Sequence, residues 1–367
     1  MTMTTKTPSS TPTSTDDAIR PSFSSRVGTF TAASGQTGGL LGLAVVVLVV
    51  FTLLSPRIYP SALNLQSIGY AVPEIALLAL AVCITMSSGG IDLSIVATAN
   101  LSALISATVS IGLVAAGTPA GLAVLLGVLI GLAVGVLCGL FNGFLVAKLR
   151  IAPILATLAT MTLFTGIALI VTRGEPVYGL PEEFLALGTA TVAIVPVSFW
   201  IFVLIVGLLW FVMNRTGLGL RVILVGASPE AADYSGIRRS RVLLQTYALS
   251  GLIAGVAGLM MSARSASATA DYGSSYLLLA ITIAVLGGTN PTGGRSPIVG
   301  VAVGAVVLQM ISSGFNILQI SPYFYQIVQG LILVLVLILE LRRSRLQRWL
   351  RGLVSRPAKD GDLAPLP

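Results

Sequence analysis

The sequence predicts an all-α polytopic membrane protein with about ten transmembrane helices and both termini in the cytoplasm. Apolar residues make up 55% of the 367 residues and charged residues only 9%, whereas soluble domains carry roughly 25% charged residues. Ten apolar segments approach the ~20 residues that a spanning helix needs. When these segments are threaded through a membrane in order, 18 of the 21 basic residues fall on one side. Only Arg57, Arg173 and Arg264 fall on the other, and an excess of Lys and Arg marks cytoplasmic loops.

Three regions follow from this threading. Residues 1–37 are rich in Thr, Ser, Pro and Gly without apolar periodicity, which predicts a disordered cytoplasmic tail. Residues 38–343 form the transmembrane domain, and residues 344–367 form a basic cytoplasmic tail. The expected spans lie near 38–55, 71–87, 94–113, 120–147, 153–172, 192–213, 243–262, 276–287, 297–315 and 323–341. The eighth is short, and we expect a short or partly re-entrant helix, because removing it would place the C-terminal arginines outside.

Small and polar residues recur at helical spacing in three spans. The fourth span has a glycine every four residues from Gly127 to Gly143, and the third has serine or threonine at the same spacing from Ser94 to Ser110. The ninth carries a polar face that includes Gln309, and such a face is costly to turn toward lipid. Close helix packing and lining of a passage are both open for these stripes. The candidate lining residues are Ser102, Ser106, Gln309, Ser312 and Asn316.

Several kinds of chemistry are excluded by what the chain lacks. There is no His, and both cysteines lie inside apolar runs, so we expect neither a metal site nor a disulfide. Glu74, Asp92 and Glu340 are expected toward helix ends, which leaves no mid-span charge for an ion-coupled carrier. None of the three lysines completes a phosphate-binding loop, so any ATP must be bound by another subunit. The net charge of +8 reflects arginines at cytoplasmic helix ends rather than a nucleic-acid partner.

The cytoplasmic loop 214–242 contains a segment, GASPEAADYSGI, with the pattern of a short capped helix. Ser228 suits the N-cap, Pro229 the first helical position, Glu230 the positive end of the helix dipole, and Gly236 the left-handed terminating position. Such a helix could insert into a cleft on a soluble partner, or it could be a surface turn among lipid headgroups. The loop by itself does not separate these two interpretations.

Four segments in sequence resemble the ribose-type permeases of ATP-binding-cassette (ABC) importers. They are SSGGIDLSI at 87–95, NGFLVAKLRIAPILATLATM at 142–161, the SPEAADYSGI loop, and AVLGGTNPTGGRSPIVGVAVGA at 284–305. The resemblance covers about residues 40–341. It implies a bacterial inner-membrane permease, not itself an enzyme, that works with a cytoplasmic ATPase, an extracytoplasmic binding protein and a second permease copy or paralogue. It implies no cofactor on this chain and a neutral monosaccharide as cargo.

The resemblance also implies roles for particular residues. Asp92 is expected to cap the following helix, with contact to the ATPase as the alternative. The implied ATPase-coupling residues are Ser228, Glu230, Ala231, Ala232, Ser235 and Gly236. The implied glycine-loop residues are Gly89, Gly90, Asp92, Gly287, Gly288, Gly293 and Gly294. Two alternatives stay open for the whole chain: a self-contained channel or secondary carrier for a neutral solute, and an importer of the same type for amino acids or nucleosides.

Overall fold

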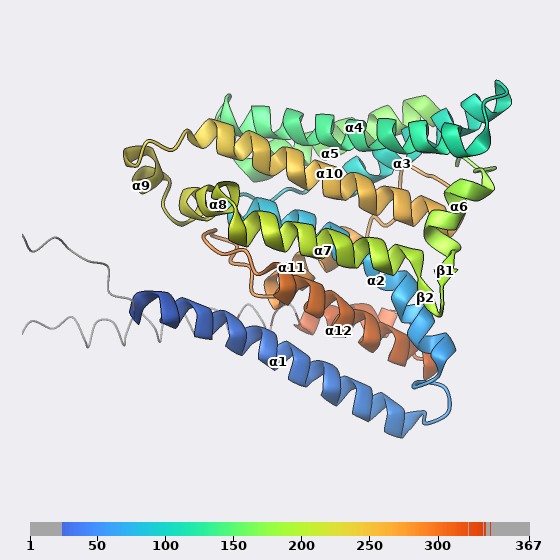
Figure 1. The fold of residues 1–367 in the computed structure, drawn as a ribbon, viewed down its shortest axis with the longest axis horizontal. Coiled ribbons are helices and arrows are strands. Elements are labelled where there is room, and N and C mark those ends of the chain that lie inside the picture. The colour runs from blue at the N-terminus through green and yellow to red at the C-terminus, as the bar shows by residue number, and fades with distance from the viewer. Residues whose placement is uncertain (1–23, 322, 333, 335–337, 339–367) are drawn as a thin grey trace, which may run out of the picture.

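A computed structural model describes residues 24–321, 323–332, 334 and 338 of the chain. Long helices lie side by side in it, with α9 at one end of the molecule and α6 and the β1–β2 hairpin at the other (Figure 1). The helices are α1 (Ser24–Leu54), α2 (Ala62–Ser87), α3 (Ile95–Ala115), α4 (Ala120–Ala147), α5 (Pro153–Thr172), α6 (Glu182–Thr189), α7 (Val197–Arg215), α8 (Gly217–Ala227), α9 (Pro229–Tyr234), α10 (Arg239–Ser265), α11 (Tyr276–Leu286) and α12 (Ile298–Ile317). The strands are β1 (Thr191–Val192) and β2 (Val195–Pro196), which pair antiparallel.

The prediction of an all-α polytopic membrane protein is confirmed. Within the described residues, eight helices are long and apolar enough to cross a membrane: α1, α2, α3, α4, α5, α7, α10 and α12. The eighth expected span is α11, whose 11 residues extend only ~16 Å against the ~30 Å of a hydrocarbon core. The tenth expected span, 323–341, is helical over 323–332, and the rest of it, like the 344–367 tail, lies largely outside the described residues.

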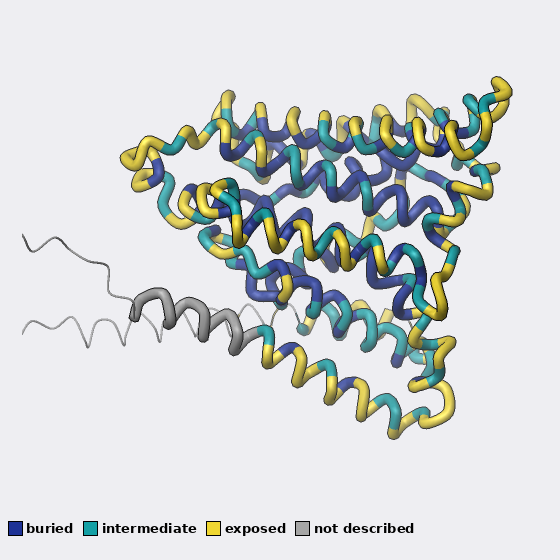
Figure 2. The backbone as a smooth tube through the Cα atoms, viewed as in Figure 1, coloured by how far each residue is buried: buried dark blue, intermediate teal, exposed yellow. Residues whose placement is uncertain are grey.

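Helix α2 runs through the centre of the molecule and is the most buried of the spans (Figure 2). It begins at Ala62, earlier than the expected residue 71, because Ser61 caps it by accepting a hydrogen bond from the Asn64 N–H at 3.2 Å. Pro73 lies inside the helix. The polar residues near 64–74 therefore belong to the span itself and do not precede it.

The glycine stripe of α4 packs directly against two neighbouring helices. A Cβ atom added at Gly131 would lie 2.8 Å from the Ser102 carbonyl oxygen on α3, and one added at Gly139 would lie 2.2 Å from the Tyr247 carbonyl oxygen on α10. The stripe thus passes from α3 to α10 along its length. This is the drift expected when a four-residue repeat runs along a helix of 3.6 residues per turn.

Four features differ from the expected boundaries or were not expected. Helix α1 begins at Ser24, inside the segment 1–37 for which we expected a tail; residues 1–23 lie outside the described residues. Helix α6, the β1–β2 hairpin and helix α8 occupy stretches that the sequence suggested as loops or as part of a span.

Between α10 and α11, residues 266–275 are irregular, and the Asn100 side chain of α3 donates hydrogen bonds to the Ala270 and Tyr272 carbonyls. These bonds satisfy backbone groups that could not remain free inside a membrane.

Candidate functional site

Helix α9 has the capped geometry that its sequence predicts. Ser228 is the N-cap and accepts a hydrogen bond from the Ala231 N–H at 3.3 Å, and Pro229 takes the first helical position. The helix ends where Gly236 adopts φ +72°, and the Ile237 N–H then donates to the Ala232 carbonyl at 3.1 Å. The short helix is thus confirmed, while its role as a coupling element stays a prediction.

The outer face of α9 is open to solvent, and it carries an aromatic residue that the sequence interpretation missed. Tyr234 is 94% exposed, and Glu230 and Asp233 are exposed beside it. Only Ala232 faces inward, where it is 2% exposed. An almost fully exposed tyrosine is typical of a protein-docking surface, because aromatic residues supply much of the binding energy there. The signal in the sequence was an aromatic residue inside a polar two-turn helix.

The C-terminus of α8, which leads directly into α9, rests on both predicted glycine loops, and the structure brings these loops together at the same end of the molecule. The Gly294 N–H donates to the Ser87 carbonyl at 3.1 Å, and the Ser87 hydroxyl donates to the Arg295 carbonyl at 2.8 Å. A Cβ atom added at Gly226, the penultimate residue of α8, would lie 2.1 Å from the Ser87 carbonyl oxygen and 2.8 Å from the Gly294 nitrogen. The loops that follow α2 and α11 and the C-terminus of α8 therefore meet backbone to backbone.

The predicted glycine-loop residues play two different structural parts. Gly89, Gly288, Gly293 and Gly294 adopt positive φ, which favours glycine. Gly90 and Gly287 do not adopt positive φ, but neighbouring atoms leave no room there for a side chain. A Cβ atom added at Gly90 would lie 2.7 Å from the Tyr247 hydroxyl, and one added at Gly287 would lie 2.5 Å from the Val301 backbone nitrogen.

Asp92 is buried, and its contacts favour the capping interpretation. It is 2% exposed, and its carboxylate accepts hydrogen bonds from the Ser94 N–H at 2.9 Å and the Ser94 hydroxyl at 2.7 Å at the start of α3. Asn142 of α4 donates to the same Ser94 hydroxyl at 2.7 Å. Burial raises the pKa of the Asp92 carboxyl above its usual range. Because Asp92 has almost no accessible surface, a partner cannot touch it in this conformation.

The candidate lining residues fall into two environments. Ser102 and Ser106 are fully buried and lie against Gly131 and Gly135 of α4, so here they contact a helix and face no open passage. On α12, Gln309 and Ser312 are partly exposed and Asn316 is exposed. Their role in a passage stays a prediction, and the burial of the two serines favours helix packing for the α3 stripe.

An ion pair between a buried carboxylate and a partly exposed guanidinium joins α2 to α10, and it corrects the expectation that Glu74 lies near a helix end. Glu74 sits in the middle of α2, and its carboxylate lies 3.1 Å from the Arg264 guanidinium. The side chain of Glu74 is 2% exposed and that of Arg264 is 39% exposed. The pair could not be predicted from the sequence because its two members are far apart along the chain and the expected span began at residue 71, which placed Glu74 near its end. The pair is neutral as a whole.

Comparison with known proteins places most of the chain in one family. Residues 64–337 match the family described as "Branched-chain amino acid transport system / permease component". The ribose import permease protein of Bacillus subtilis is 36% identical over 86% of this chain and 95% of its own length. The L-arabinose transport system permease protein of Escherichia coli is 31% identical over 84% and 92%. The D-allose transport system permease protein of Escherichia coli is 32% identical over 82% and 90%. No solved structure matches the chain.

Proposed function

The chain belongs to the branched-chain amino acid transport system / permease component family, and from this premise we propose that α9 is where a separate cytoplasmic ATPase docks and drives transport. The chain is the membrane-spanning permease subunit of an ABC importer in the bacterial plasma membrane, and it is not itself an enzyme. Its cargo is a monosaccharide, since relatives that match more than four-fifths of the chain are permeases for ribose, L-arabinose and D-allose.

The partners belong to the proposal. The ATPase binds the ATP, so the permease needs no cofactor of its own. An extracytoplasmic binding protein delivers the sugar at the end of the molecule opposite α9, and a second permease copy or paralogue completes the assembly. The end that carries α9 faces the cytoplasm, because the clustered arginines of residues 215–241 lie there, and translocated loops are poor in Arg.

The observation that carries this proposal is the exposed face of α9 on a rigid base. Tyr234, Glu230 and Asp233 are available to a partner, whereas the C-terminus of α8, just before α9, meets the loops after α2 and α11 through backbone atoms at Gly226 and Gly294. Backbone contacts at this distance leave no flexible side chain to absorb a displacement. A push on α9 is therefore passed to α2, the central helix, and to the segment that leads into α12.

The proposal is tested by changing the left-handed residue that ends α9. Gly236→Val forces a β-branched residue into a positive-φ position, at a cost of about 1–2 kcal/mol or more. We expect loss of sugar uptake and of sugar-stimulated ATP hydrolysis in vesicles that contain the permease, ATPase and binding protein. Membrane insertion should be normal, because an added Cβ at residue 236 has no atom within 4 Å.

A matched control separates coupling from backbone strain. Gly117 also has positive φ, at +86°, and also has no atom within 4 Å of an added Cβ, but it lies between α3 and α4 at the opposite end. Gly117→Val should therefore import sugar at close to the unmodified rate. Full import by Gly236→Val, or equal loss in both variants, would refute the coupling role of α9.

The polar face of α12 offers a separate test of the passage. Gln309→Ala and Asn316→Ala should lower the rate of sugar uptake while leaving the sugar concentration for half-maximal uptake almost unchanged, because the binding protein sets affinity. Unchanged uptake rates in both variants would remove these residues from the passage.

A further inference from the structure

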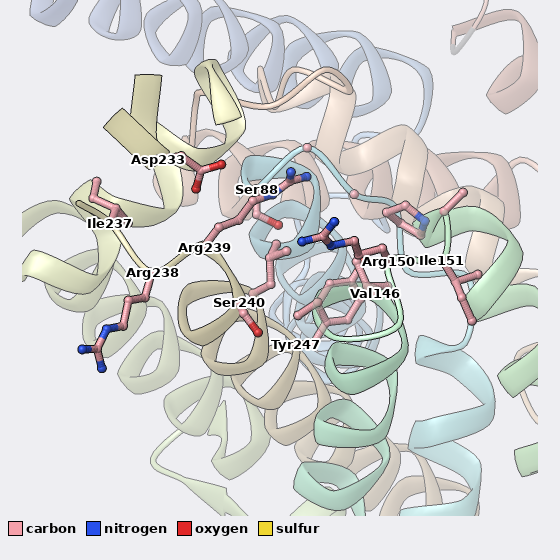
Figure 3. Close-up of a pocket in the computed structure, with 16 residues that line it drawn as sticks. Ser88, Val146, Arg150, Ile151, Asp233, Ile237, Arg238, Arg239, Ser240 and Tyr247 are labelled. Atoms are coloured by element: carbon pink, nitrogen blue, oxygen red, sulfur yellow. The ribbon is translucent and has the colours of Figure 1, made fainter. Parts of the chain in front are cut away.

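A cavity of about 710 Å³ lies beside α9, where the loop after α2, the connection between α4 and α5, and the start of α10 come together. Its volume is that of a small-molecule site. Figure 3 shows the guanidinium groups of Arg150 and Arg239 directed into the same space near Ser88, whereas Arg238 points away. No coupling role requires this cavity, and its chemistry is that of an anion site.

Two helix N-termini also open onto the cavity. Helix α5 (20 residues) begins at Pro153 and helix α10 (27 residues) at Arg239, and residues of both first turns line it. Neither helix has a side-chain cap. Pro153 has no N–H, but the N–H groups that follow it in the first turn of α5, and those at the start of α10, are available to an acceptor. Uncapped N-termini attract anions through these N–H groups and through the helix dipole.

Unpaired guanidinium groups are the polar groups that this cavity leaves free. Tyr247 also lines the cavity, but its hydroxyl is buried against Gly90, away from the open space, and has no hydrogen-bond partner among the described residues. Within the described part of the chain, neither Arg150 nor Arg239 is ion-paired. The Asp233 carboxylate at the rim opposes one of the two positive charges.

Arg150 also occupies a backbone position that glycine would fill more easily. It has φ +58°, and the Ile151 N–H that follows it donates to the Leu145 carbonyl near the end of α4 at 3.2 Å. An arginine is strained in this left-handed conformation, and glycine is not. The left-handed turn carries the guanidinium into the cavity.

We propose that this cavity binds a phosphate group, held by the guanidinium groups of Arg150 and Arg239 and by the N-termini of α5 and α10. Guanidinium groups hold phosphate oxygens through charge-assisted hydrogen bonds, and several converging donors suit a group with several acceptor oxygens. The phosphate belongs either to a free phosphate ester in the cytoplasm or to an anionic lipid headgroup.

The experiment measures binding to the full-length permease purified in detergent and depleted of lipid. In one arm, radiolabelled inorganic phosphate is titrated against this lipid-depleted permease by equilibrium dialysis at low salt. In the other arm, the permease is reconstituted into nanodiscs that contain both phosphatidylglycerol and phosphatidylcholine. Native mass spectrometry then counts the molecules of each lipid that stay bound to the permease. Saturable phosphate binding indicates a free-anion site, and selective retention of one phosphatidylglycerol without phosphate binding indicates a headgroup site.

Variants tie either result to the cavity. Arg150→Gln and Arg239→Gln should each weaken binding about ten-fold or more, since each removes a donor to a charged group. Arg150→Gly should lose binding and still melt no lower than the unmodified chain, because glycine relieves the left-handed backbone. This variant separates loss of the ligand from loss of the fold.

The control is Arg241→Gln, which removes the same charge from the first turns of α10. Arg241 does not line this cavity; it lines a smaller one of about 230 Å³ with Arg221 and Arg238. The proposal is overturned if neither probe binds, or if Arg241→Gln weakens binding as much as Arg239→Gln. It is also overturned if assembly with the ATPase abolishes phosphate binding while a cysteine at Ile151 cross-links to that subunit, because the cavity would then be a protein-docking surface. These results do not depend on transport, so they stand apart from the coupling test.

Discussion

Replacing Gly139 by alanine tests the close packing of α4 on α10. The new Cβ would lie 2.2 Å from the Tyr247 carbonyl oxygen and 2.9 Å from the Tyr247 carbonyl carbon. A carbon and a carbonyl oxygen normally stay about 3.3–3.6 Å apart, so the two helices must separate by about 1 Å. Overpacking of this kind costs about 1–3 kcal/mol, and the upper end applies because a backbone carbonyl cannot rotate away.

Helix propensity works in the opposite direction and sets the net value. Alanine is favoured over glycine inside a helix by about 0.8–1.0 kcal/mol, which leaves Gly139→Ala destabilising by about 2 kcal/mol. Gly166 lies within α5 and has no atom within 4 Å of an added Cβ. Gly166→Ala therefore keeps the propensity gain, and the two variants should differ by about 3 kcal/mol with opposite signs.

The assay is the loss of folded permease with time at one elevated temperature, followed in the same detergent for both variants. Rates are compared because membrane proteins of this size commonly unfold irreversibly. We expect Gly139→Ala to unfold faster than the unmodified chain and Gly166→Ala to unfold no faster. A Gly139→Ala variant as long-lived as Gly166→Ala would refute the close contact between α4 and α10.

Three further predictions follow from the described contacts. Arg264→Gln should lower thermal stability by leaving the Glu74 carboxylate buried without its partner. The loss should be smaller than the ~3–5 kcal/mol of a fully buried pair because Arg264 is 39% exposed, and adding Glu74→Gln should restore part of it. Asp92→Ala should cost about 1–2 kcal/mol through its lost hydrogen bonds, whereas Asp92→Asn keeps an acceptor. Since burial raises the Asp92 pKa, the stability of the unmodified chain relative to Asp92→Asn should fall as pH rises through that pKa; a constant difference across pH would contradict this. In whole cells, an impermeant thiol reagent should label a cysteine at Tyr178 and not one at Ser240, and the reverse pattern would overturn the orientation.

The spans whose limits could be predicted from the sequence are those whose ends are marked by local chemistry. α4 lies between Pro119 and Lys148 and α5 starts at Pro153, and both match the expected limits. The start of α2 was expected at residue 71, later than the local cap at Ser61 places it. The partner of the Glu74 carboxylate inside the span could not be read locally, because Arg264 belongs to a helix far along the chain.

The candidate site divides along the same line. The caps of α9 follow from three neighbouring residues, Ser228, Pro229 and Gly236, so they could be predicted. The contact of Gly226 with Ser87 depends on how distant segments pack, and no local pattern contains it. The cavity beside α9 is of the latter kind, because Arg150 and Tyr247 are ordinary residues in sequence and acquire a shared environment only in the fold.

The central claim, that α9 is the docking surface for the ATPase, is tested most directly by cross-linking at its most exposed residue. A cysteine at Tyr234, which is 94% exposed, carries a short photoreactive cross-linker in the assembled importer. Cys83 and Cys138 are buried, so they should not compete for the reagent. We expect a cross-link to the ATPase subunit from position 234 and none from the same label at Tyr178, at the opposite end. A cross-link from position 178 to the ATPase, with none from position 234, would contradict the account.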